Sequence, residues 1–155
     1  MAWIFTSAAL GRLLAHRDDD PLVRWFDQQR MLPVITPVAL ADLRRAVRHE
    51  RSYNDSERLG MVLALAALAH DLDADTYQHA VRRYPDSEAV DILSQLLDVP
   101  AGEAIGEIDM ISAALAIRHE MHLVVTDKIE HWNALARNLP NATWTLRLVS
   151  EFPPQ

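Results

Sequence analysis

Cysteine is absent from this chain of 155 residues. Its absence excludes disulfides, thiolate metal sites and cysteine nucleophiles together, and it favours a reducing cytoplasm. Any bound metal would therefore need oxygen or imidazole ligands. Long apolar runs are lacking too, because the longest, 61–69, is about half the length of a membrane span. With no basic leader ahead of its apolar start, the chain is predicted to be cytoplasmic, without a secretory signal or membrane association.

Glycine is scarce, and the four glycines, at 11, 60, 102 and 106, are isolated, so no Gly-rich phosphate loop is present. No GxSxG nucleophile elbow occurs, and RHEMH at 118–122 lacks the HExxH spacing of zinc proteases. The formal net charge of −7 disfavours a general nucleic-acid coating protein. The arginines gathered at 44–51 form either a local basic surface or a solvated helix face.

Half of the sequence is apolar, and its length suits one domain, 1–155. Short apolar runs alternate with helical patterns, and helix starts are marked by Ser7, by Asp20 with Pro21, and by Thr36 with Pro37. The patterns predict strands at 2–6, 33–35, 122–126 and 143–149. They predict helices at 8–16, 20–30, 36–50, 56–70, 75–84, 87–98, 109–119 and 129–138.

Strands separated by helices need crossover connections, which makes a mostly parallel sheet with helices on both faces. We therefore predict an α/β fold of three layers, α/β/α, around a central sheet of four to five strands. In such folds ligands bind beyond the carboxyl ends of the strands. Residues that bind a ligand or act in catalysis should therefore lie at that edge.

Three aspartates are expected at or near this edge. Asp127 follows the strand at 122–126, Asp109 begins the helix before it, and Asp42 lies in the second turn of the helix at 36–50. Carboxylates gathered from separate elements repel one another unless a cation such as Mg²⁺ or Mn²⁺ neutralises them. Such ions can activate water against a phosphodiester. The alternative is structural: a helix cap at Asp109, a turn at Asp127, and at Asp42 an ion pair with Arg45.

Four stretches, in order, carry a resemblance to a known family: IFTSAALGRLL at 4–14, DPLVRWFD at 20–27, ITPVALADLRRAV at 35–47 and DMISAALAIRHEMHLVVTD at 109–127. Together they resemble the PIN domain, in particular the VapC-type toxins of prokaryotic toxin–antitoxin pairs. Residues 52–100 match only as generic helices. The resemblance implies a PIN-like α/β/α fold with Mg²⁺ or Mn²⁺ at its acidic edge. It also implies RNA cleavage, a homodimer and a cognate antitoxin protein.

Carried onto this sequence, the resemblance makes Asp42, Asp109 and Asp127 the catalytic and metal-binding acids. It places Thr6 beside the metal and Ser7 near the substrate. Arg12, Arg44 and Arg45 are candidates to contact RNA phosphates. At the family's first acidic position, however, this chain has Phe5, which cannot ligate a hard cation.

The departure at Phe5 leaves alternatives open. The leading prediction is an Mg²⁺- or Mn²⁺-dependent endoribonuclease with an incomplete site and reduced activity, in which Asp42, Asp109 and Asp127, helped by Thr6 or Ser7, hold one ion. A shifted first strand could also bring another acid into the gap. The competing prediction is a catalytically impaired PIN-like module that binds a protein partner or RNA without cutting it.

Overall fold

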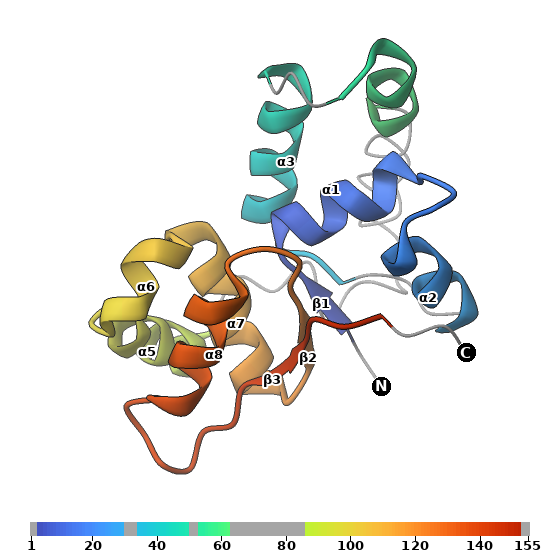
Figure 1. Cartoon of the computed structure of the whole chain (residues 1–155). Coiled ribbons are helices and arrows are strands. Elements are labelled where there is room, and N and C mark those ends of the chain that lie inside the picture. Colours follow the sequence, from blue (N-terminus) through green and yellow to red (C-terminus); the bar gives the residue numbers. More distant parts are fainter. Residues whose placement is uncertain (1–2, 30–33, 50–52, 63–85, 153–155) are drawn as a thin grey trace.

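The computed structural model describes residues 3–29, 34–49, 53–62 and 86–152 (Figure 1). The predicted helix at 75–84, most of the one at 56–70 and part of the strand at 33–35 lie outside these residues. Residues 55–62 are helical. The other described helices are α1 (Ser7–Ala15), α2 (Pro21–Gln29), α3 (Pro37–His49), α5 (Ser87–Leu96), α6 (Pro100–Ile105), α7 (Glu107–His119) and α8 (Ile129–Arg137). The strands are β1 (Trp3–Phe5), β2 (His122–Val124) and β3 (Arg147–Val149).

Side-chain caps fix the starts of three helices. The Thr6 hydroxyl accepts the N–H of Ala9 at 3.2 Å ahead of α1, and the Thr36 hydroxyl accepts the N–H of Ala39 at 3.0 Å ahead of α3. The Asp86 carboxylate accepts from the third residue of α5. Each cap satisfies a backbone donor that has no partner within its helix. These are places where local sequence decides structure.

The prediction of a sheet of four to five strands is wrong. The sheet of the described residues has three parallel strands in the order β1-β2-β3, with Ile4 opposite Leu123 and Leu123 opposite Leu148. Val34 adds only an isolated bridge to Ile4. Thr36 caps α3 two residues later, so the described part of this extended segment ends there. The described fold is mainly helical, with a small parallel sheet, and the predicted three-layer PIN-like architecture is corrected accordingly.

Helices lie to either side of this sheet. In Figure 1, α1, α2 and α3 lie toward the top and right, and α5 to α8 lie on the left. Helix α7 packs against β1, β2, α3 and α5, while α8 packs against α6 and β3. The central position of α7 explains why it is apolar on most sides, since a helix covered all round has no solvent stripe. The short helix α6 was not predicted from the sequence.

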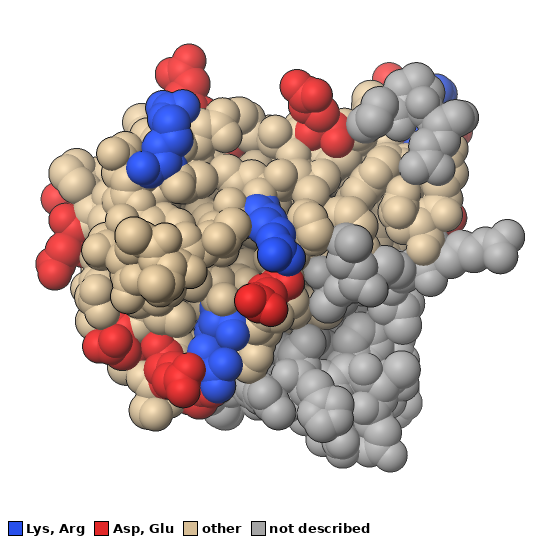
Figure 2. Space-filling model, turned by 90° about the horizontal axis from the view of Figure 1, so that it is seen from below, with Lys and Arg blue, Asp and Glu red and all other residues tan. Residues whose placement is uncertain are grey.

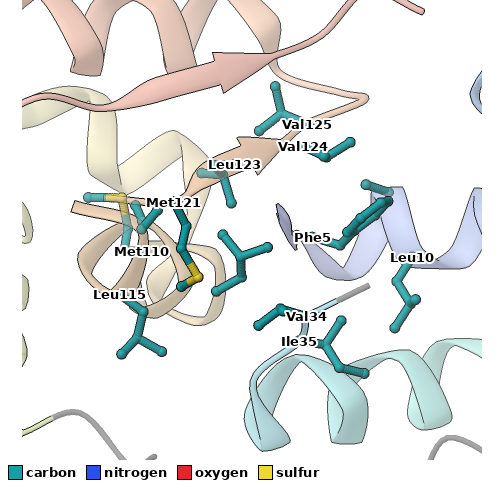
Figure 3. Close-up of a cluster of buried hydrophobic side chains, with 14 of the residues drawn as sticks. Phe5, Leu10, Val34, Ile35, Met110, Leu115, Met121, Leu123, Val124 and Val125 are labelled. Atoms are coloured by element: carbon teal, nitrogen blue, oxygen red, sulfur yellow. The ribbon is translucent and has the colours of Figure 1, made fainter. Parts of the chain in front are cut away.

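Buried side chains from all these elements form one cluster. Figure 3 shows part of it, in which Phe5, Leu10, Val34 and Val124 bring β1, α1 and β2 together. This packing fixes the carboxyl ends of β1 and β2, where the candidate site begins. Across the described residues, no helix combines the length and the apolar character that crossing a bilayer demands.

Candidate functional site

A cavity of about 480 Å³ opens beside the carboxyl ends of β1 and β2. We call it the acidic pocket, because Asp42, Asp109 and Asp127 all line it. It lies where the parallel topology predicts a ligand site. Other residues lining it are Ser7, Ala8, Leu43, Arg45, Ala46, Tyr53, Ile105, Gly106, Glu107, Ile108 and Lys128.

Ser7 links two of the three acids. Its hydroxyl donates to Asp42 Oδ2 at 3.0 Å, and its backbone N–H points to Asp109 Oδ1 at 3.4 Å. Asp42 comes from the second turn of α3 and Asp109 from the first turn of α7. Residues separated by 35 and 102 positions therefore meet at the start of α1. The predicted convergence of these residues on one pocket is observed.

Electrostatics distinguish Asp109 from its neighbours. Burial raises the pKa of its carboxyl from 3.8 to about 6, and the nearby charges of Asp127 and Asp42 act in the same direction. The Ser7 N–H and the charge of Lys128 oppose this rise in pKa. Burial and like charges disfavour an ionised carboxyl, whereas a donor or a cation favours it. The ionised form of Asp109 is thus disfavoured by burial and by the neighbouring acids.

Other predicted site residues are placed away from the acidic pocket or are already engaged. The hydroxyl of Thr6 is buried and caps α1. Arg12 forms a two-pronged ion pair with Asp20, through Nε at 3.0 Å and Nη2 at 2.5 Å, and its guanidinium lies 5.9 Å from the Phe152 ring centroid. Arg44 is exposed on α3 and does not line the pocket. Of the three predicted arginines, Arg45 alone lines it.

Phe5 occupies core space. It is fully buried, and its ring packs edge to face on Phe26 with the centroids 5.6 Å apart. Such a position supplies packing energy and no ligand atom.

Three pocket residues with polar or charged side chains, Glu107, Lys128 and Tyr53, were missed from the sequence. Lys128 lines the pocket and donates from Nζ to the Ile105 carbonyl at 3.2 Å. Tyr53 reaches the pocket from the segment between α3 and the helix at 55–62. Lys128 directly follows Asp127, so a charge of opposite sign beside the predicted acid was the available signal. Nothing in the sequence marked Tyr53.

A divalent ion would need the pocket acids as its ligands. Within the part of the chain that the structure describes, no three His, Asp or Glu side chains are arranged to hold a metal ion. Binding of Mg²⁺ or Mn²⁺ by Asp42, Asp109, Asp127 and Thr6 therefore stays a prediction.

Comparison with known proteins finds likeness in structure alone. No protein-family model and no curated protein matches the chain. A chain of VapBC2 from Rickettsia felis, solved bound to a DNA fragment from their promoter, has a TM-score of 0.60 at 14% identity, over 97% of this chain and 99% of that chain. A chain of the Neisseria gonorrhoeae FitAcB structure gives 0.60 at 14% identity, over 96% of both chains. A chain of VapBC-1 from nontypeable Haemophilus influenzae gives 0.58 at 14%, over 97% and 98%.

These findings correct the family assignment. Membership of the PIN-domain, VapC-type ribonuclease family is not retained, because no family model matches and the described sheet is smaller than predicted. The endoribonuclease function and the RNA substrate, which rested on that membership, are withdrawn with it, and the comparisons give a hydrolase no support. What the chain shares with chains of VapBC and FitAB complexes, at 10 to 14% identity, is a fold.

Proposed function

We propose that this protein is the partner-binding component of a two-protein complex of the toxin–antitoxin type. The likeness to chains of VapBC and FitAB complexes supports this proposal, because it extends over 96% or more of both chains in each comparison. Those chains come from structures of VapBC and FitAB, and three of these structures hold DNA. The proposed activity is recognition of a second protein rather than chemistry on a substrate.

Charge favours a basic segment of that second protein as the contact. The chain carries a formal net charge of −7, and four acids line the acidic pocket against two bases. Complementary charge steers association and rejects like-charged partners. On the face seen in Figure 2, the described Lys and Arg side chains lie singly, interspersed with acidic ones. Scattered cations of this kind release few counterions from nucleic acid, so we propose no DNA contact on this face.

Co-expression tests the proposal. A tagged copy of the full chain is expressed with the product of the neighbouring gene, and the purified material is examined by size-exclusion chromatography with light scattering. A stable complex of both proteins is expected. The predicted homodimer stays a prediction, and the mass of the chain purified alone decides it. If the two proteins separate on the column, the proposal fails.

The role of the pocket needs matched variants. Asp109→Asn combined with Asp127→Asn removes two pocket charges while nearly keeping side-chain volume. Asp27→Asn is the control, because Asp27 is exposed and lies outside the pocket. The double variant should bind the partner about tenfold or more weakly, whereas the control should bind as the native chain does. If the native chain, the double variant and the control bind the partner equally well, the partner does not contact the acidic pocket.

A further inference from the structure

The acidic pocket gathers negative charge from three separate elements. Asp42 and Asp127 both act electrostatically on Asp109. Such a cluster needs a cation, and a divalent ion is one solution. The chain's own cations are another, and the pocket contains two of them, Arg45 and Lys128.

Arg45 engages the first acid. Its Nη2 donates to Asp42 Oδ1 at 2.8 Å, one helical turn along α3. The second oxygen of Asp42 accepts the Ser7 hydroxyl at 3.0 Å. Both oxygens of Asp42 therefore already have a donor. A metal ion could take either oxygen only by displacing a hydrogen bond, one of which is assisted by charge.

Lys128 acts on Asp109. It follows Asp127 directly, and its charge favours the ionised carboxyl of Asp109. The ammonium is held by the Ile105 carbonyl at 3.2 Å, just ahead of the first turn of α7 that carries Asp109. Lys128 is also the single lysine of the chain.

The backbone of Lys128 is strained. Its φ of 52° and ψ of 35° place it in the left-handed region, which a residue other than glycine adopts only with strain. Glycine would fit this position without strain. Two interactions of the lysine side chain offset this strain: the hydrogen bond to the Ile105 carbonyl and the attraction between its charge and Asp109.

Phe5 supplies no ligand atom to the pocket. At the carboxyl end of β1, where a further acid would extend the cluster, the chain has a fully buried ring instead. With Asp42 paired to Arg45, the pocket carboxylates left for an ion are Asp109, Asp127 and the exposed Glu107. Lys128 follows Asp127 directly, and its charge acts on Asp109. In the described part of the chain, no three acids or histidines are arranged for a metal.

We propose that Arg45 and Lys128 are built-in counter-cations of the acidic pocket, so that the native protein takes no divalent ion there. The pocket residues therefore do not fit the magnesium or manganese ion predicted from the sequence. Removing the counter-cations should turn the pocket into a cation site. One unit charge about 6 Å from a divalent ion changes the ion's affinity about tenfold in water.

Titration of the full-length protein with Mn²⁺ alone, followed by calorimetry at neutral pH, tests the proposal. The variants are Lys128→Gly, the same change combined with Arg45→Gln, and Lys128→Arg as a control that keeps the charge. Lys128→Gly relieves backbone strain, so it is not expected to unfold the protein, and circular dichroism checks this. A triple variant that adds Asp109→Asn locates any ion gained.

The native chain and Lys128→Arg should show no saturable Mn²⁺ binding below about 1 mM. Lys128→Gly should bind about tenfold tighter than the native chain, and the double variant tighter again. Asp109→Asn should abolish the gain. Submillimolar binding by the native chain that Asp109→Asn removes would overturn the proposal. So would a double variant that binds no better than the native chain.

Discussion

Replacing Asp109 by Asn should make the protein more stable at neutral pH and leave its stability unchanged in acid. Asn has nearly the same shape, and its amide oxygen can still accept the Ser7 N–H. What the substitution removes is a carboxyl whose pKa is raised from 3.8 to about 6, chiefly by burial.

Between the two pKa values, the folded protein keeps the Asp109 proton while the unfolded chain has lost it. The folded state therefore binds more protons, and stability falls as pH rises from about 4 to about 6. A gap of about 2 pH units corresponds to about 3 kcal/mol. Since Asp109 is only partly buried, solvent screening reduces this to about 1–3 kcal/mol, which Asp109→Asn should recover above about pH 6.

Urea denaturation followed by tryptophan fluorescence measures the effect from about pH 4 to about pH 8. The stability difference between Asp109→Asn and the native chain should grow across this interval and then level off. Asp27→Asn, on an exposed side chain, should stay within about 0.5 kcal/mol at every pH. A gain for Asp109→Asn that is independent of pH, or a loss at the upper end, would refute the reasoning.

Three further outcomes concern stability. Phe5→Ala should cost about 3–5 kcal/mol in urea denaturation, because the fully buried ring also loses its contact with Phe26; a cost under about 1 kcal/mol would contradict this core role. Gly106→Ala should lower the melting temperature, because φ is +98° there and no L residue adopts it freely; an unchanged transition would count against the strain. Asp20→Ala should cost about 1–3 kcal/mol near neutral pH, since Asp20 accepts from Arg12 and from the Leu22 N–H. Because the Arg12 hydrogen bond lowers the pKa of Asp20, that loss should fade as pH falls below about 4, and a loss of equal size in acid would be the contrary result.

The local sequence predicted the helix starts well, because interactions between residues close in the chain determine them. The start predicted at Thr36 is confirmed, because its hydroxyl caps α3. The first helix also begins where it was predicted, but the capping hydroxyl belongs to Thr6 and not to Ser7, which was the predicted cap. The parallel relation of β1 and β2 also follows from the helices between them. The number of strands did not follow, because a strand exists only where another segment pairs with it, and the segment at Val34 forms a single bridge.

By itself, the sequence determined which acids could meet at the strand ends, because α/β connectivity brings Asp42 and Asp109 to the edge beyond β1. Tertiary structure alone decided what surrounds them. The two oxygens of Asp42 accept hydrogen bonds from Ser7 and Arg45, and Lys128 lines the same pocket. The physical reason is that periodicity and caps act over a few residues, whereas the charge balance of a pocket sums over groups far apart in the chain.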